Sequence, residues 1–204
     1  MLELRFRWKP YLRYGQKLSV DKNKVVYRQG ERGRGFYYLE NGEIKITLLS
    51  DKGDERIINI VPTGMLFGEH GVQNEPYLTS ASTSCESTIY YFSDEVLATI
   101  CREYPNAATT YTDSLIYKFR ILAEIVSLLD SPVDQQIAYY LHKLHIENGS
   151  VPMNQTAFAK YIGTSRVTLN KILQDWKKQD LIEINNRQIK ILQLEKIWEI
   201  ATKE

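Results

Sequence analysis

The chain has 204 residues, which is enough for one large domain or two small ones. Hydrophobic residues make up 43% of it, and 26 Lys or Arg residues nearly balance 25 Asp or Glu, so packed cores are expected rather than a disordered chain. No apolar run reaches the ~18–20 residues that a membrane helix needs, and no apolar segment of a secretory signal stands near the N-terminus. We therefore expect a cytosolic protein.

Residues 15–95 are predicted to form β structure. Short runs rich in β-branched and aromatic residues occur at Val25–Tyr27, Phe36–Leu39, Ile44–Leu49, Arg56–Val61 and Thr88–Phe92. The glycines between them follow one another at intervals of 12, 11 and 11 residues, and they are Gly30, Gly42, Gly53 and Gly64. Strands separated by turns at this interval indicate an antiparallel sandwich or barrel.

A different kind of glycine site lies in the loop-like run from Gly68 to Pro76, where Glu69 directly follows Gly68. Backbone N–H groups of such a loop can bind an anion, and a neighbouring carboxylate can accept a hydrogen bond from a hydroxyl. The pair is therefore a candidate ligand site, and a purely structural turn is the alternative.

Helical patterns follow the β region. Ser93 or Asp94 caps a predicted helix over Glu95–Tyr104, and Pro105 precedes a long pattern over Asn106–Leu129. Apolar residues recur along it every seven positions, with others between them: Ala108, Leu115, Leu122 and Leu129, then Tyr111, Phe119 and Val126. Such a seam is typical of two packed helices, so we predict a homodimer. A helix packed on its own β domain is the alternative.

The pair Ser131-Pro132 ends this helix and divides the chain. The predicted parts are a β domain over residues 1–104, a dimerisation helix with a hinge over 105–130, and a C-terminal domain over 131–204. A further amphipathic helix is expected over Pro132–His145, with Ile137, Leu141 and Leu144 facing inward.

Two short helices around a glycine are predicted within residues 154–182. Asn154 suits the N-cap of the first helix, and Gly163 suits its left-handed end. Thr164 or Ser165 caps the second helix, whose predicted buried face is Leu169, Ile172, Leu173 and Trp176. Its opposite face carries Arg166, Val167, Asn170, Lys171 and Gln174.

This opposite face suits the major groove of DNA, because Arg can bind guanine, Asn can bind adenine, and an apolar side chain can contact a thymine methyl. A hairpin that would form a wing follows, since isoleucines alternate around Asn185-Asn186 at Ile182, Ile184, Ile189 and Ile191. Residues 150–192 contain seven Lys or Arg and three Asp or Glu, a net charge of +4, whereas the whole chain carries +1. A small helical pair with a solvated basic face is the alternative.

The order of these parts resembles the Crp/Fnr superfamily of bacterial transcription regulators over about residues 23–192. The motifs that carry the resemblance are VVYRQGE (25–31), FYYLENGEIKI (36–46), GMLFGE (64–69) and IGTSRVTLNKIL (162–173). The resemblance implies an α+β fold with an N-terminal antiparallel β-roll of the cyclic nucleotide-binding, jelly-roll type, a long dimerisation helix and a C-terminal winged helix-turn-helix. It further implies a homodimer that binds a near-palindrome of double-stranded DNA and works with RNA polymerase.

The outer helix face, the wing and the resemblance together predict DNA contacts at Gln155, Thr164, Ser165, Arg166, Val167, Thr168, Asn170, Lys171 and Arg187. Recognition helices of the family commonly read Ser-Arg-Glu-Thr-Val-x-Arg, so Ser165 and Arg166 match, whereas Val167 stands where the glutamate would be. Because valine cannot form hydrogen bonds, the operator is expected to depart from the common consensus at that base pair. Lys171 takes the second Arg position, which keeps the charge and loses the forked geometry.

The resemblance also places an effector pocket near Gly68, Glu69, His70, Tyr77, Lys118 and Arg120. Nucleotide-binding members follow Gly-Glu with Pro-Arg-Ser, whereas this chain has Pro76-Tyr77-Leu78 there. Without an Arg, the cost of removing the phosphate charge from water is poorly compensated. An unknown small-molecule effector is therefore expected in place of cyclic AMP, and no cofactor is assigned. Lys118 or Arg120 is a candidate cation for an acidic effector, with a solvated basic face as the alternative.

Two rival functions remain open. One is an effector-binding module whose winged helix contacts protein instead of DNA, and the other is a cupin-like metal enzyme. The second needs two or three histidines inside the barrel, where the sequence places His70 alone. Catalytic and metal-ligating residues are therefore not assigned, and an enzyme is not expected. Cys85 and Cys101 are expected to be two separate buried thiols.

Overall fold

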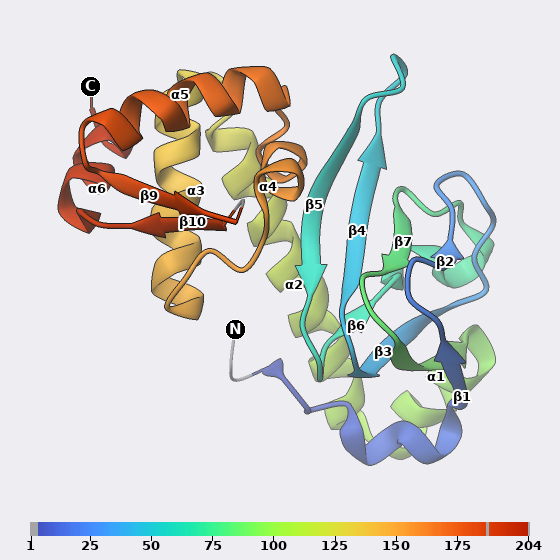
Figure 1. The fold of residues 1–204 in the computed structure, drawn as a ribbon. Helices are drawn as coiled ribbons and strands as arrows, with labels where there is room; N and C mark the ends of the chain where they lie inside the picture. The colour runs from blue at the N-terminus through green and yellow to red at the C-terminus, as the bar shows by residue number, and fades with distance from the viewer. Residues whose placement is uncertain (1–3, 187, 204) are drawn as a thin grey trace. The chain divides into compact units, whose positions relative to one another are not determined.

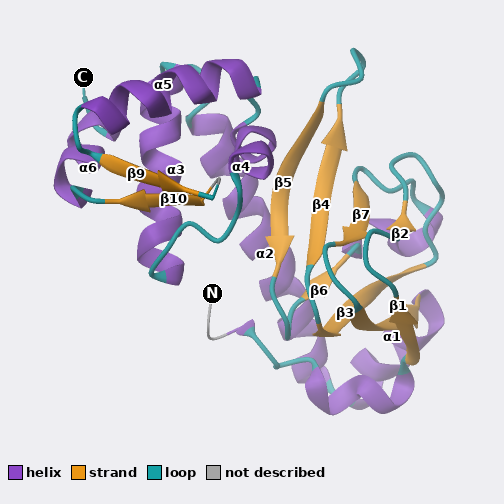
Figure 2. Ribbon diagram, viewed as in Figure 1, coloured by secondary structure: helices purple, strands orange, loops and turns teal. Residues whose placement is uncertain are grey.

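The computed structural model describes residues 4–186 and 188–203. The chain forms two compact units, Met1–Glu124 and Ile125–Glu204. Figure 2 shows that strands dominate the first unit, whereas the second is mostly helical apart from one hairpin. None of the helices that the structure describes is long and apolar enough to cross a membrane.

The first unit is a β-roll of two four-stranded sheets, ordered β1-β8-β3-β6 and β2-β7-β4-β5, in which every pairing is antiparallel (Figure 1). The strands are β1 Gln16–Val20, β2 Val25–Tyr27, β3 Gly35–Asn41, β4 Ile44–Leu49, β5 Glu55–Val61, β6 Leu66–Phe67, β7 Ser80–Thr83 and β8 Ser87–Ser93. The five predicted strands are all present. The sequence analysis did not single out β1, β6 and β7, which are short or polar and carry little periodic signal.

The four predicted turn glycines all adopt positive φ: Gly30 at 84°, Gly42 at 102°, Gly53 at 85° and Gly64 at 92°. At Gly42 the space is also closed, since a Cβ there would lie 2.2 Å from the Ser87 hydroxyl oxygen. Glycine is the residue that tolerates both conditions, so this turn depends on it. The turns let the strands bury a shared core that includes Leu39, Ile44, Phe67 and Ile89.

The segment before β1 packs against a core cluster of the roll through Trp8. Trp8 is almost fully buried, and its ring meets Phe36 and Phe92 edge-on at centroid distances of 5.3 and 5.7 Å. A short 3-10 helix, Lys9–Tyr14, follows it. Arg7 forms an ion pair of 2.9 Å with Asp113 of the long helix, which connects the segment to that helix.

Helix α1, Asp94–Glu103, begins with Ser93 as its N-cap, as predicted, and the side chain of Ser93 accepts from the backbone N–H of Val96. Helix α2, Pro105–Ser127, is the predicted long helix, and it ends before Leu129, which lies in the following turn. Five of the predicted seam residues on α2 are exposed: Ala108, Leu115, Phe119, Leu122 and Val126.

Tyr111 was predicted to lie in the seam, and that placement is wrong. Its hydroxyl donates to the backbone oxygen of Glu69 at 3.0 Å, so the ring faces the roll of its own chain. Helix α2 therefore has two stripes. Ala107, Tyr111, Ser114, Lys118 and Ile121 are buried or partly buried, whereas Ala108, Leu115, Phe119, Leu122 and Val126 are exposed.

The second unit contains α3 Val133–Asn148, α4 Gln155–Ile162, α5 Arg166–Lys178, β9 Ile182–Asn185, β10 Gln188–Ile191 and α6 Leu194–Ala201 (Figure 1). Helix α3 buries Ile137, Leu141 and Leu144, as predicted. Helix α6 was not predicted; it packs against α3, where Trp198 stacks on His142 at 4.5 Å.

The two cysteines are both free. Cys101 is partly buried, whereas Cys85 is exposed, so the expectation of two buried thiols was wrong for Cys85. Cys85 lies in the turn between β7 and β8, where the chain leaves the sheet. Within the described residues, no group of three or more His, Cys, Asp or Glu side chains could hold a metal ion.

Candidate nucleic-acid interface and ligand cavity

The turn between α4 and α5 is closed by backbone geometry. Gly163 adopts φ +83°, and the N–H groups of Gly163 and Thr164 both donate to the carbonyl of Ala159 at 3.0 Å. Asn154 caps α4, since its side-chain oxygen accepts from the N–H of Ala157 at 3.0 Å. The two helices are therefore joined at a tight turn of set geometry, as the sequence predicts.

Ser165 is the N-cap of α5, and its hydroxyl oxygen accepts from the N–H of Thr168 at 3.0 Å. The same hydroxyl lies 2.8 Å from the Thr168 hydroxyl. Both side chains thus stabilise the first turn of the helix. The positive end of the helix dipole is at this turn, which favours a nearby anionic group.

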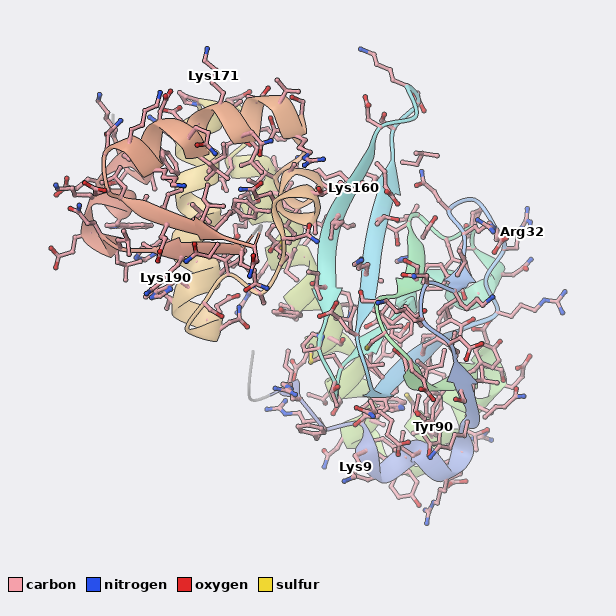
Figure 3. All side chains as sticks on the ribbon, in the orientation of Figure 1. Lys9, Arg32, Tyr90, Lys160, Lys171 and Lys190 are labelled. Atoms are coloured by element: carbon pink, nitrogen blue, oxygen red, sulfur yellow. The ribbon has the colours of Figure 1, made fainter. Side chains whose placement is uncertain are left out.

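Helix α5 is clearly amphipathic. Leu169, Leu173 and Trp176 are buried, as predicted, and Ile172 is partly buried. The outer face contains Val167, which is 80% exposed, together with Arg166, Lys171 and Gln174. Figure 3 shows Lys171 extending from α5 into solvent. Neither Arg166 nor Lys171 forms an ion pair with any residue in the described part of the chain.

Three other predicted contact residues, Gln155, Thr164 and Asn170, are only partly exposed. The side-chain oxygen of Asn170 is buried without a hydrogen-bond partner. Asn170 is therefore less available than Arg166 for bonding to a base, because reading adenine uses both atoms of the amide.

The wing is the hairpin of β9 and β10, in which Ile184 pairs with Ile189 and Ile182 with Ile191. Asn186 adopts φ +48°, which asparagine tolerates well. Arg187 lies outside the described residues. Lys190 is exposed (Figure 3) and lies 4.0 Å from Glu183 on the paired strand, which reduces the positive charge of the wing.

A cavity of about 230 Å³ lies in the roll unit, with walls from β2, β4, β5, β6 and α2. Gly68, His70 and Lys118, three of the residues predicted for the effector pocket, line it. Tyr77 lies outside the lining and stacks on the lining residue Tyr27, with ring centroids 3.9 Å apart. Arg120 is exposed and does not line the cavity, so Lys118 remains the candidate cation there.

Glu69 lies beside this cavity and is almost completely buried, with a side chain 1% exposed. One of its carboxylate oxygens, Oε1, accepts from Ser114 at 2.8 Å and forms an ion pair with Lys118. The second, Oε2, has no hydrogen-bond partner. Lys118 also donates to Ser114 at 2.8 Å, so two side chains of α2 that bind each other both bind Glu69.

The sequence analysis missed Ser114 and the apolar walls of the cavity. Ser114 and Lys118 are four residues apart and therefore share a face of α2, which is a signal that could have placed both beside Glu69. Tyr27, Ile58 and Ile121 come from three separated segments that meet in the roll. No spacing along the chain brings those three together.

Comparisons with known proteins agree with this geometry. Residues 17–104 match the family profile of the cyclic nucleotide-binding domain, and residues 135–200 match that of the Crp-like helix-turn-helix domain. The cyclic AMP receptor protein of Thermus thermophilus is 25% identical over 196 residues, which span 93% of this chain and 90% of that protein. The fumarate and nitrate reduction regulatory protein of Vibrio cholerae is 20% identical over 91% of this chain and 78% of its own length.

Solved structures show the same fold. The c-di-GMP responsive global regulator CLP of Xanthomonas campestris superposes with a TM-score of 0.81 at 18% identity, covering 90% of this chain and 96% of that one. A CooA mutant from Carboxydothermus hydrogenoformans gives a TM-score of 0.81 at 19% identity, covering 95% of this chain and 90% of that one.

Replacing Lys118 tests the link between Glu69 and α2. Lys118→Met is expected to lower the free energy of unfolding of the roll by about 3 kcal/mol, because it leaves a buried carboxylate without its cation. Urea unfolding followed by circular dichroism measures the change. The matched control, Arg120→Met, removes an exposed cation from the same helix and should change stability by less than about 0.5 kcal/mol. Equal effects of the two substitutions would contradict this role of Lys118.

Proposed function

The chain belongs to the Crp/Fnr family of DNA-binding transcription regulators, and from that premise we propose that it acts as a homodimer on a near-palindromic operator. Each α5 helix enters one of two successive major grooves, with half-sites one helical turn, ~34 Å, apart. The observation that carries this proposal is the outer face of α5, where Arg166 and Lys171 extend into solvent without a counter-charge among the described residues.

The two cations have different tasks. Arg166 stands at the first position of α5, where its fork can bond O6 and N7 of a guanine together. Lys171 lies further along the outer face and suits a phosphate, because its ammonium acts as a point charge. Val167, between them in sequence, offers methyl groups to a thymine and no hydrogen bond, so we propose an operator with thymine at that base pair.

Dimerisation is proposed along the exposed stripe of α2. Phe119 is 72% exposed and Val126 63% exposed, and Leu115 and Leu122 extend the same stripe. A continuous apolar stripe of this length is unusual on the surface of a monomer. Its spacing of alternating three and four residues suits a second copy of the same helix.

The signal at the roll is proposed to be an effector other than cyclic AMP. In the described part of the cavity lining, Lys118 is the one cation, and it is already paired with Glu69. A phosphate bound there would lack the forked Arg that such anions favour. The effector acts by binding one arrangement of the protein better than another, which changes how the hinge at Asp130–Pro132 presents the winged helices.

The relatives of this chain named above include a regulatory protein, so we place RNA polymerase among its partners, the cytosol as its location, and no enzymatic reaction among its activities. A winged helix that contacts protein instead of DNA is the rival. That rival predicts that selection from a random pool of duplexes at low salt recovers no bound DNA, with or without effector.

Arg166→Ala tests the base-reading role on the duplex that the wild-type protein selects from a random pool. The substitution should cost about 1–3 kcal/mol in binding and relax the preference at a single base pair, because it removes the bidentate contact. Competition binding with single-base variants of the duplex measures both. Lys177→Ala is the control, since it removes one charge from the last turn of the same helix. If Arg166→Ala bound all variants with the wild-type order of preference, Arg166 would not read a base.

Lys171→Ala tests the phosphate contact. A plot of log binding constant against log salt concentration should become shallower by about one unit, while the order of preference among duplexes stays the same. Titrations at four or more salt concentrations measure the slope. Lys22→Ala, which removes an exposed charge from the roll unit, should leave the slope unchanged. An unchanged slope for Lys171→Ala would exclude a phosphate contact.

Phe119→Glu tests the dimer. Placing a carboxylate in an apolar helix seam should weaken association by more than about 3 kcal/mol, which is roughly a hundredfold in Kd. Sedimentation velocity over a concentration series measures the monomer–dimer equilibrium. Ala123→Glu adds the same charge to an exposed position outside the stripe and should remain dimeric. A dimer of wild-type stability in Phe119→Glu would place the interface elsewhere.

A further inference from the structure

The cavity of the roll has mainly apolar walls. Ile46 of β4, Ile58 of β5 and Phe67 of β6 line it together with Ile121 of α2. Leu78 also lines it, is exposed and lies outside the proposed dimer stripe, so solvent reaches the cavity beside it. Its volume of about 230 Å³ is below the ~300–1,000 Å³ of typical pockets for drug-sized ligands, which points to a small occupant.

The cavity offers an anion no free positive charge. Lys118 is the one lining residue, within the described chain, that carries a permanent charge, and Glu69 and Ser114 already bind its ammonium. An anion that approached Lys118 would also approach the Glu69 carboxylate. Taking a charged group from water into such a place is costly unless a partner compensates it.

The histidine in the lining is neutral and already has partners. Burial lowers the pKa of His70, so the ring is uncharged at neutral pH. Its Nδ1 accepts from the N–H of Leu78 at 3.3 Å, so Nε2 carries the proton and lies 3.1 Å from the Thr79 hydroxyl oxygen, which accepts it. His70 therefore has no ring nitrogen left for a ligand.

Tyr27 provides a buried polar group in the lining that lacks a hydrogen-bond partner. Its side chain lines the cavity and is 3% exposed, and its hydroxyl is buried without a well-formed hydrogen bond. Burial raises the pKa of Tyr27, so its hydroxyl keeps the proton at neutral pH. The O–H of Tyr27 then remains to donate. A buried donor without an acceptor costs free energy that a ligand can recover.

The position of the Tyr27 ring is set by its neighbours. The ring stacks on Tyr77 at 3.9 Å and lies over Gly68, where a Cβ would come within 3.0 Å of it. Gly68 adopts φ +77°, so a larger residue is disfavoured on both grounds. The Tyr27 ring is therefore held in place in the cavity lining.

We propose that this cavity binds a small, uncharged, mostly apolar molecule with one acceptor group for the Tyr27 hydroxyl. The proposal rests on the function proposed above, because it names the chemical class of the effector that the roll senses. It replaces the acidic effector that the sequence suggested for Lys118.

The test compares three probes of similar size on the full-length protein by isothermal titration calorimetry. Acetophenone is neutral and has an acceptor, ethylbenzene is neutral and has none, and benzoate is an anion. Acetophenone should bind about tenfold or more tightly than benzoate, since desolvating the carboxylate is not compensated. Tyr27→Phe should weaken the binding of acetophenone by about three- to tenfold, because it removes the hydrogen bond. The affinity for ethylbenzene should stay the same, because ethylbenzene makes no such bond.

A second pair of variants locates the binding. Ile58→Trp fills the cavity and should abolish binding of both neutral probes, whereas Leu49→Trp, at an exposed position of β4 outside the lining, should not affect it. The proposal is overturned if benzoate or cyclic AMP binds as well as acetophenone. It is also overturned if the Ile58→Trp variant binds the neutral probes with wild-type affinity, or if neither neutral probe binds the wild-type protein at millimolar concentration.

Operator binding is measured separately on the same preparations without any probe. Loss of probe binding with intact operator binding rejects this inference alone. Probe binding without any operator binding rejects the proposed function and leaves the ligand class in place.

Discussion

The buried carboxylate of Glu69 constrains the whole N-terminal unit. A carboxylate that is 1% exposed needs a cation and hydrogen-bond donors, and both come from α2 through Lys118 and Ser114. The long helix is thereby held against the roll at one defined register. The same pairing neutralises the cation at the cavity wall, so one interaction sets both the position of α2 and the kind of ligand that the cavity favours.

Helix α2 can connect sensing to assembly because its two stripes differ. The inner stripe, with Tyr111, Ser114 and Lys118, contacts Glu69, whereas the outer stripe presents Leu115 and Phe119 to solvent. Ile121 and Leu122 line the cavity on the same helix. A ligand that alters the packing around Ile121 would act on the helix that carries the proposed dimer seam, without any separate relay.

The winged helix combines a helix-turn-helix scaffold with a proposed DNA-reading face that carries valine in place of glutamate. The side-chain caps at Asn154 and Ser165 and the left-handed backbone turn at Gly163 are local to the protein and do not depend on the DNA sequence. The reading face depends on side chains that the scaffold leaves exposed. Val167, 80% exposed with no polar atom, is the position where this protein's operator should depart most from a glutamate-reading relative.

Much of this molecule was determined by the sequence alone. Local signals, such as the turn glycines, the caps and the isoleucine alternation of the wing, placed five strands of the roll and the helix-turn-helix, because each depends on a few neighbouring residues. Such local signals do not predict contacts between segments that are far apart in the sequence. Trp8 in the core, the inward turn of Tyr111, the pairing of Glu69 with Lys118 and the unpaired hydroxyl of Tyr27 arise only where separate elements meet. Tertiary structure decided them, because burial and pairing depend on which side chains fold together and not on their spacing along the chain.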